Sequence, residues 1–409
     1  MALFQRRLPH ALQAWVVVGA SCLVMGMAFG MLISVSVFLK PLETEFGWGR
    51  GVTSFAYSSA SFMTGVVGIA MGRLVDRISP RPIVLTGAVM LGAGHLLLSR
   101  IDAVWQLYLI YGLLVGGLGA GCFVIPLLAN VGFWFERHRG LAIGAVMAGQ
   151  SLGGAVMPGI SRYLLTELAW RDAYAVLGLA AWAVLIPLAL LVRAPPGLAA
   201  LKASAHAQGA PLAAIAPNRL IATLCVAIVC CCVCMAIPVM HVYPLAVEAG
   251  FAPSQAAAVL GTMMSVSIVG RIGIGKVADH VGGIRSLLLA SGIQTALIFW
   301  FSQMHTLAGL LLIAVLFGVG YGGVVPSYAI IIRELMPVRR VGFAMGLVFF
   351  FGNMGMSLGG YLGGLLYDLS GAYPVAYATG ALAGLVNLAI VGALLVTTRA
   401  RQTAAPVPA

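Results

Sequence analysis

One arginine lies inside a long apolar stretch of this chain. The residues from Phe251 to Gly270, which precede Arg271, carry no charge. A permanent charge near the middle of a bilayer costs roughly 2.5 to 3.5 kcal/mol on insertion scales, so it needs a compensating role. A guanidinium can bind a carboxylate through two parallel hydrogen bonds, and such a pair would be weak in bulk water. Arg271 is therefore a candidate anion-binding residue. A long side chain close to a helix end could instead extend to the lipid headgroups.

Polar residues that could complete an anion site are few. Ser267 precedes Arg271 by one helical turn and shares its face. Tyr321 lies in the glycine-rich segment "GVGYGG", where its small neighbours leave room around the hydroxyl. Tyr57, Gln150 and Asn353 are further candidates, although hydrogen bonding between helices explains them equally well or better.

The elements that would position these residues are membrane-spanning helices. The composition is 61% hydrophobic and 8% charged, with 52 glycines in 409 residues, which excludes an ordinary soluble domain. A bilayer needs about 20 apolar helical residues per span, and the chain offers a dozen such blocks. The predicted spans are 14–39, 52–72, 82–100, 104–130, 140–164, 172–193, 220–244, 253–275, 284–302, 306–330, 340–366 and 373–396. We therefore expect an all-α integral membrane protein with twelve transmembrane helices.

The distribution of charge sets the expected orientation. With alternating spans and an internal N-terminus, 17 of the 23 Lys and Arg residues fall in internal segments. The exceptions are Lys40, Arg50, Arg100, Arg162, Arg171 and Arg271. This bias predicts that both termini are cytoplasmic in a multi-pass protein of the plasma (inner) membrane. It also argues against nucleic acid as the reason for the net charge of +12.

Two local patterns imitate other chemistry. The segment "GRIGIGKV" has the glycine spacing of a phosphate-binding loop, but it lacks the Ser or Thr that would hold magnesium and it lies in a span. ATP hydrolysis is therefore not expected. Five of the seven cysteines lie in "CVAIVCCCVC", within one apolar span, and we interpret them as packing residues rather than metal ligands. We expect no catalytic residues, no metal and no cofactor.

The chain contains an internal repeat with a period near 202 residues. "GRLVDRISPR" at 72–81 corresponds to "GKVADHVGGIR" at 275–285, so that Asp76 matches Asp279. "GGLGAGCFVIP" corresponds to "FGVGYGGVVP", and "RGLAIG" to "VGFAMG". The repeat predicts two pseudo-symmetric six-helix halves, 1–193 and 220–409, joined by a cytoplasmic linker, 194–219. Parallel repeats of this kind place a substrate site between the halves.

These features resemble the major facilitator superfamily over essentially the whole chain. The loop signature of that family is matched by Gly72, Arg73, Asp76, Arg77 and Arg81, and Gly275 and Asp279 repeat it in the second half. The segments "VFLKPLETEFGW", "WFERHRGLAIGAVMAGQSLGG" and "AWRDAYAVLG" are similar to the bacterial branch of monocarboxylate porters and oxalate/formate antiporters. The resemblance implies a secondary transporter, not an enzyme, in which the signature residues form a conformational gate and Arg271 binds substrate.

The sequence departs from that branch at two positions. Ile33 replaces the lysine that the animal monocarboxylate transporters carry in the first span, and Ser267 stands where many proton-coupled relatives have an acid. A proton would then bind to the substrate carboxylate, to water or to a histidine, for which His95 and His241 are candidates. Each of these histidines is more commonly a packed helix residue.

A single fixed cation favours a monoanion, because an unpaired second carboxylate would be heavily penalised. We therefore expect a monomeric, proton-coupled carrier of a small organic monoanion, such as a lactate-like or pyruvate-like monocarboxylate, working by alternating access in the lipid bilayer. The alternatives are efflux or antiport of another small organic compound, drug-like or dicarboxylate, or a membrane sensor that does not transport.

Overall fold

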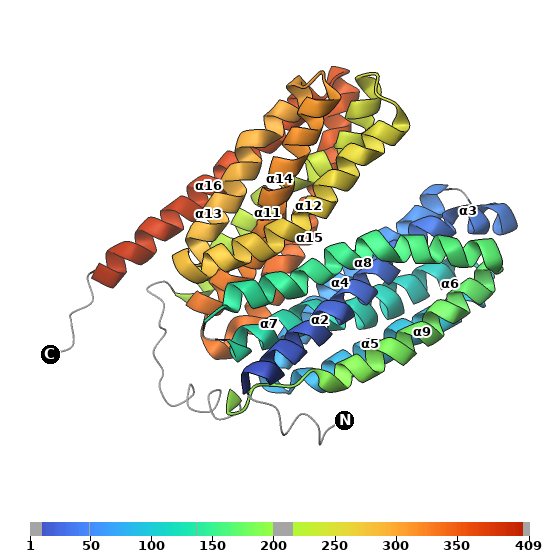
Figure 1. Ribbon diagram of the computed structural model, residues 1–409, viewed down its shortest axis with the longest axis horizontal. Coiled ribbons are helices and arrows are strands. Elements are labelled where there is room, and N and C mark those ends of the chain that lie inside the picture. Colours follow the sequence, from blue (N-terminus) through green and yellow to red (C-terminus); the bar gives the residue numbers. More distant parts are fainter. Residues whose placement is uncertain (1–9, 49, 136, 199–215, 404–409) are drawn as a thin grey trace. The chain divides into compact units, whose positions relative to one another are not determined.

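The computed structural model describes residues 10–48, 50–135, 137–198 and 216–403, and in this part of the chain the regular secondary structure is entirely helical (Figure 1). The first half contains α2 (His10–Ile33), α3 (Val35–Phe46), α4 (Arg50–Arg77), α5 (Pro80–Leu98), α6 (Val104–Leu109), η1 (Ile110–Gly119), η2 (Ala120–Cys122), α7 (Val124–Trp134), α8 (Arg139–Glu167) and α9 (Trp170–Leu191). The second half contains α11 (Pro217–Glu248), α12 (Pro253–Val281), α13 (Gly283–Ile298), η3 (Phe299–Gln303), α14 (Leu307–Leu335), η4 (Val338–Arg340), α15 (Val341–Ser370) and α16 (Pro374–Thr403).

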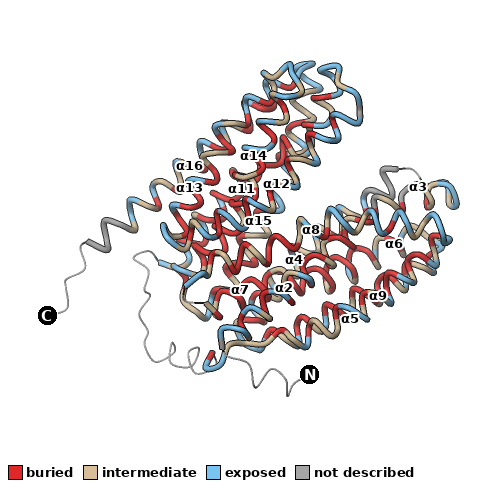
Figure 2. The backbone as a smooth tube through the Cα atoms, in the orientation of Figure 1, coloured by how far each residue is buried: buried red, intermediate tan, exposed pale blue. Residues whose placement is uncertain are grey.

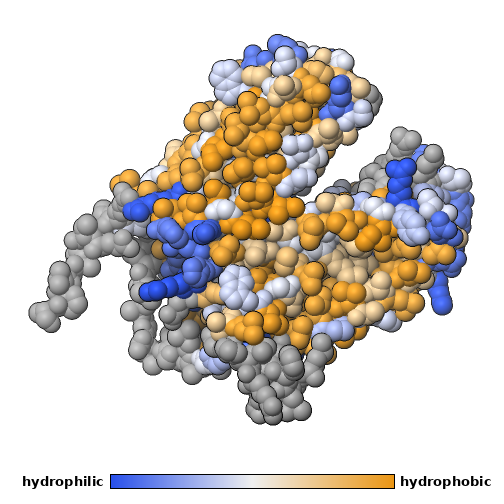
Figure 3. Space-filling view, viewed as in Figure 1, coloured by the Kyte–Doolittle hydropathy of each residue, from blue (hydrophilic) through white to orange (hydrophobic). Residues whose placement is uncertain are grey.

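Twelve helical segments of the described chain are long and apolar enough to cross a membrane, as predicted. The fourth span combines α6, η1, η2 and α7, and the ninth combines α13 with η3. The exposed sides of the helices are largely apolar, and hydrophilic residues gather near helix ends (Figure 3). This surface is that of a multi-pass membrane protein, because lipid-facing side chains must be apolar while the backbone is satisfied within each helix.

The chain divides into two compact units. Unit 1 contains residues 1–207 and 338–346, and unit 2 contains residues 208–337 and 347–409. The first turns of α15 thus belong to unit 1, whereas the rest of that helix belongs to unit 2. In each unit we call the end near residues 194–219 the linker end, and the opposite end the distal end. Most of the predicted linker lies outside the described residues, so its boundaries stay a prediction.

The first span is shorter than the sequence predicted. We expected a helix over residues 14–39, but α2 ends at Ile33 and α3 starts again at Val35. The Ser34 hydroxyl donates to the Gly30 carbonyl at 2.7 Å, and the Tyr111 hydroxyl donates to the Leu32 carbonyl at 2.7 Å. The Ser34 N–H still donates to the Gly30 carbonyl at 3.0 Å, so the side-chain donor that competes for a helical acceptor is the Tyr111 hydroxyl on the Leu32 carbonyl. The helix is therefore interrupted next to Ile33.

The fourth span is irregular along its glycine-rich segment. Residues Ile110–Gly119 form a π-helix, and Ala120–Cys122 form a 3-10 turn. A methyl group on Gly116 would lie 2.3 Å from the Ala60 carbonyl oxygen, so the backbones of η1 and α4 are in direct contact. The Thr64 hydroxyl donates to the Gly116 carbonyl at 2.9 Å. Irregular backbone in a membrane helix is tolerated where other groups satisfy it in this way.

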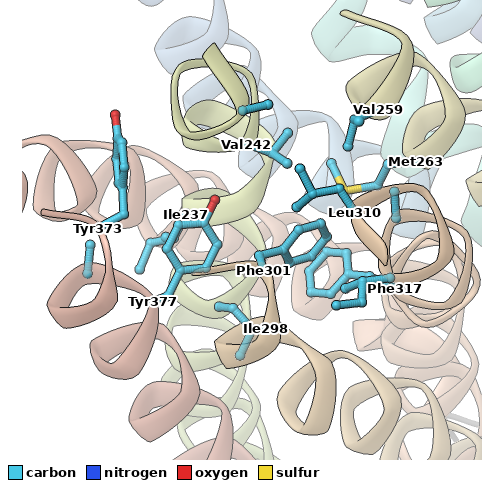
Figure 4. Close-up of a cluster of buried hydrophobic side chains, with 14 of the residues drawn as sticks. Ile237, Val242, Val259, Met263, Ile298, Phe301, Leu310, Phe317, Tyr373 and Tyr377 are labelled. Atoms are coloured by element: carbon cyan, nitrogen blue, oxygen red, sulfur yellow. The ribbon is translucent and has the colours of Figure 1, made fainter. Parts of the chain in front are cut away.

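Buried residues occur along the helices of both units (Figure 2), and most of them are apolar. In the distal half of unit 2, Phe301 packs against Phe317 with ring centroids 5.5 Å apart, and against Tyr377 at 6.0 Å (Figure 4). Val242 of α11 and Met263 of α12 belong to the same buried cluster. Aromatic contacts of this kind hold helices by dispersion, which is a main source of helix association in a membrane.

Candidate functional site

Arg271 lies in the interior of unit 2 rather than on its lipid-facing surface. Its side chain belongs to α12, and the residue is only 8% exposed. An arginine that extended along the surface toward headgroups would be mostly exposed. The burial of Arg271 therefore favours a side chain that binds a group inside the unit over one that extends to the lipid headgroups.

Glycines bring the neighbouring helix α14 against Arg271. A methyl group on Gly322 would lie 2.2 Å from the Ser267 carbonyl oxygen and 2.9 Å from the backbone nitrogen of Arg271. On the other helix, a methyl group on Gly270 would lie 2.3 Å from the Val319 carbonyl oxygen. Small residues on both sides allow such backbone contact between membrane helices. The glycines of α12 and α14 thus fix the position of the backbone that carries the Arg271 side chain.

Two of the predicted partners lie at this contact. The guanidinium of Arg271 forms a side-chain hydrogen bond with the hydroxyl of Tyr321, which comes from α14. Ser267 is 1% exposed, and its hydroxyl donates to the Met264 carbonyl at 2.6 Å. The structure thus brings Arg271, Tyr321 and Ser267 together, as one cation with two neutral hydroxyl groups. Such an arrangement can bind an anion and orient it.

The other three predicted substrate residues lie on different helices. Tyr57 on α4 and Gln150 on α8 belong to unit 1, and both are half-buried. Asn353 on α15 belongs to unit 2 and is exposed. Its backbone carbonyl accepts a hydrogen bond from the Ser357 hydroxyl at 3.1 Å. Their role in substrate binding stays a prediction.

The loop signature surrounds the start of α15. The Asp76 carboxylate accepts hydrogen bonds from the backbone N–H groups of Gly342 at 2.9 Å and Phe343 at 3.0 Å. These donors have no partner within their own helix, so Asp76 caps it, and the negative charge is favourable at a helix N-terminus. The Arg73 guanidinium lies 4.3 Å from the centroid of the Phe343 ring. A methyl group on Gly72 would lie 2.2 Å from the Gly342 carbonyl oxygen.

The remaining signature residues have less specific positions. Arg81 donates to the Leu190 carbonyl at 2.5 Å and so binds the end of α9. Arg77 is the exposed last residue of α4. Gly275 is buried and Asp279 is half-buried, at the corresponding places on α12.

A polar cluster at the distal end of unit 1 was not predicted. It consists of Glu45, Asp102, Trp170 and Arg171, and we call it the unit 1 distal cluster. Arg171 forms ion pairs with Glu45 and, at 3.1 Å, with Asp102, while the Trp170 indole also donates to Glu45. The Arg171 guanidinium lies 4.3 Å from the centroid of the Trp170 ring. The segments "VFLKPLETEFGW" and "AWRDAYAVLG" both contribute to it, so their joint occurrence in the sequence was the available signal.

Twelve apolar spans in two units, with a buried arginine in unit 2 and a helix start capped by Asp76 in unit 1, are typical of a membrane transporter. The comparisons identify the family. The sequence profile of the Major Facilitator Superfamily matches residues 17–329 and 286–409, and the chain belongs to this family. The family members and the structural neighbours are transporters, not enzymes.

Similar proteins include transporters from bacteria and animals. Monocarboxylate transporter 3 of Rattus norvegicus is 28% identical over 379 residues, covering 89% of this chain and 76% of that protein. The uncharacterized MFS-type transporter YcxA of Bacillus subtilis (strain 168) is also 28% identical, over 83% of this chain and 85% of its own length. Among solved structures, the human organic anion transporter MFSD10 (TETRAN) has a TM-score of 0.73 at 15% identity and covers 94% of this chain and 100% of that chain. At that identity the likeness supports the fold alone.

Proposed function

We propose that this protein carries a small organic monoanion, such as a lactate-like or pyruvate-like monocarboxylate, together with a proton, by alternating access. The observation that carries the proposal is the buried contact between Arg271 and Tyr321. A guanidinium in a water-poor interior gains much from a carboxylate that supplies two acceptors. The similarity to Monocarboxylate transporter 3 of Rattus norvegicus supports the same class of substrate.

The number of charges at this contact favours a monoanion. Arg271 supplies one positive charge, whereas Ser267 and Tyr321 supply neutral hydroxyl groups. A second substrate carboxylate would need its own cation in a medium where unpaired charges are expensive. Symport with one proton moves a monoanion without net charge, so the membrane potential does not oppose uptake.

The expected orientation follows from the basic residues. We propose that the linker ends face the cytoplasm of the plasma (inner) membrane, where positively charged loops are retained. The distal ends then face outward. The capped start of α15 would form part of a cytoplasmic gate, with Gly72, Arg73 and Asp76 in contact with it and Gly275 and Asp279 as their repeat. The functional unit of this proposal is a monomer.

Uptake of labelled monocarboxylates into proteoliposomes tests the proposal. We expect Arg271→Gln to lower uptake by about 10- to 100-fold, since a hydrogen bond to a charged group contributes about 1.5 to 3 kcal/mol. Arg285→Gln is the matched control, because Arg285 is an exposed arginine at the linker end of the same unit. Unchanged uptake in a well-inserted Arg271→Gln protein would contradict the substrate role of this residue.

The same panel decides between the alternatives. A dicarboxylate such as oxalate as the best substrate would contradict the argument from one cation. Preference for amphipathic drug-like compounds would indicate an efflux carrier. Specific binding without flux, in vesicles where a known carrier works, would indicate a sensor that kept the fold.

A further inference from the structure

A coupled proton needs a residue that titrates near neutral pH, can exchange protons with water, and contacts an element that the proton can influence. Histidine is the side chain whose ordinary pKa meets the first condition. In the described spans, His95 and His241 lie within helices, whereas His280 lies one residue before the end of α12. His95 and His241 differ in their burial and in their contacts.

His95 is sealed inside unit 1. It is 1% exposed, its Nδ1 lies 2.9 Å from the Leu91 carbonyl of its own helix, and its ring lies 6.0 Å from that of Tyr174. The ring has no open path for proton exchange in this conformation. We therefore interpret His95 as a residue that packs the interior near the interruption between α2 and α3.

His241 is half-buried and connects two helices of unit 2. Its Nε2 lies 2.9 Å from the Gly360 carbonyl of α15. A carbonyl oxygen only accepts, so Nε2 carries the proton and Nδ1 is the basic nitrogen of the neutral ring. A methyl group on Gly363 of α15 would lie 2.4 Å from the Cδ2 atom and 2.5 Å from the Nε2 atom of His241. The glycines of α15 thus leave a space that the imidazole fills.

Ionisable groups also lie on α11, on α15 and just before α16, the elements around His241. From α11 itself comes Glu248, two turns further along the helix. From α15 come Tyr367, whose hydroxyl donates to Glu248 at 2.8 Å, and Asp368, which interacts electrostatically with Tyr373. Tyr373, just before α16, has its ring 5.7 Å from that of His241 and 4.5 Å from that of Tyr367. We call His241, Glu248, Tyr367 and Tyr373 the unit 2 distal cluster.

We propose that His241 is the proton-binding residue of the transport cycle, an inference that rests on the proposed proton-coupled function. A proton from water on the distal side adds to the Nδ1 lone pair, and the Nε2–H bond to Gly360 is kept. The ring then carries a positive charge at the distal end of unit 2, the end at which Glu248 and Asp368 also lie. Hydrogen bonds from charged donors are roughly twice as strong as neutral ones, so protonation strengthens the contact between α11 and α15. Release of the same proton weakens it.

The proton site and the substrate site are at different depths of unit 2. His241 lies seven residues before the distal end of α11, which is about 10 Å at 1.5 Å per residue. Arg271 lies 18 residues after the distal start of α12, which is about 27 Å on the same basis. Direct proton transfer between the two sites is therefore not possible in this arrangement. Coupling has to pass through the movement of helices, as expected where Ser267 replaces an acid next to the arginine.

The experiment compares two modes of L-lactate transport in proteoliposomes. Uptake driven by an inward proton gradient requires proton coupling, whereas exchange of labelled for unlabelled lactate at equal pH does not require net proton movement. One pH unit can support about a tenfold accumulation for one proton per substrate. We expect His241→Gln to lose this accumulation and to keep exchange within about twofold of wild type. His305→Gln, at an exposed loop position, is the matched control and should keep both modes.

The outcomes separate the two proposals. Wild-type uptake that ignores the proton gradient would overturn proton coupling itself, and His241 with it. Gradient-driven accumulation that persists in His241→Gln would overturn only the role of His241. Loss of both modes in a monodisperse His241→Gln protein would also overturn it, by indicating a structural or substrate role.

A second variant decides the question if His241→Gln does not fold. Gly363→Ala keeps the histidine but forces its ring to move, because the new methyl group would overlap it. We expect a shifted pH midpoint of gradient-driven uptake with exchange retained. An unchanged midpoint would contradict the proposal.

Discussion

The distal ends of the two units are built on the same sequence pattern but hold different chemistry. With Asp76 aligned on Asp279, "VFLKPLETEFGW" at 37–48 corresponds to "MHVYPLAVEAGF" at 240–251. The proline, the second glutamate and the glycine coincide in the two segments. The glycines, Gly47 and Gly250, both have positive φ, at 67° and 90°, and both follow the end of a helix. The repeat therefore extends to the far end of each unit.

The partners of the two glutamates differ in charge. In unit 1, Glu45 is bound by Arg171, a permanent cation, and by the Trp170 indole. In unit 2, Glu248 is bound by the neutral hydroxyl of Tyr367. The Glu45 carboxylate is thus paired with a permanent cation, whereas the Glu248 carboxylate accepts a hydrogen bond from a neutral hydroxyl.

One further pair of positions shows the same contrast. Phe38 of unit 1 corresponds to His241 of unit 2. Phe38 stacks on Tyr174 with ring centroids 3.9 Å apart and cannot ionise. His241 occupies the matching place with a ring that can bind a proton. At these matched positions unit 1 has an ion pair and stacked rings, whereas unit 2 has a carboxylate bound by a hydroxyl and a histidine.

The largest expected effect concerns the contact between α2 and α8 in unit 1 and the contact between α11 and α15 in unit 2. A methyl group on Gly153 of α8 would lie 1.7 Å from the Gly26 carbonyl oxygen of α2, whereas one on Gly359 of α15 would lie 2.7 Å from the Val233 carbonyl oxygen of α11. Overpacking costs typically about 1 to 3 kcal/mol. We expect Gly153→Ala to reach or exceed the upper end of this range and Gly359→Ala to stay near the lower end.

Thermal unfolding in detergent measures this difference. Gly159→Ala is the control on α8, because a methyl group there would have no neighbour within 4 Å. It should leave the melting temperature nearly unchanged. Equal losses for Gly153→Ala and Gly359→Ala would contradict the expectation that the contact between α2 and α8 is tighter than the contact between α11 and α15.

A smaller effect is expected at the linker end of unit 1. Asp76→Asn retains one acceptor but turns an N–H donor toward one of the two backbone N–H groups that Asp76 now binds, Gly342 and Phe343. Loss of a helix cap costs about 0.5 to 2 kcal/mol. Unfolding in detergent should show a loss of this size, with slower transport if the capped helix is a gate. Asp102→Asn should have little effect, because the Asp102 side chain is 78% exposed. A larger effect at Asp102 would reverse this ranking.

The sequence was sufficient for the architecture but not for its interruptions. Apolar blocks and the repeat predicted twelve spans, because the length and composition of a span are local properties. The end of α2 at Ile33 could not be predicted, because the donor that binds the Leu32 carbonyl is Tyr111, on a helix far along the chain. Helix ends set by tertiary hydrogen bonds leave no local pattern.

The same distinction applies to the site. Ser267 follows from the spacing to Arg271 on one helix, and Tyr321 from the glycines around it. The partners of Glu45 could not be predicted, because Trp170 and Arg171 are about 125 residues away and no local rule pairs them. His95 and His241 looked equivalent in the sequence, and only their burial and contacts distinguish them.

The smallest expected effect concerns the pH response of the unit 1 distal cluster. Hydrogen bonds from Trp170 and from Arg171 lower the pKa of Glu45 below its ordinary value of 4.5. A carboxyl with a lowered pKa in the folded protein stabilises it above its ordinary pKa and loses this contribution as the pH falls through the folded value. Glu45→Gln should therefore change the pH dependence of the melting temperature only below about pH 4.5. The pH profile of uptake between 5.5 and 8, measured in the same preparation, should stay that of wild type, because the proton that drives uptake is assigned to His241. A shifted uptake profile in Glu45→Gln would place part of the proton response in unit 1 and remove the contrast between the two halves.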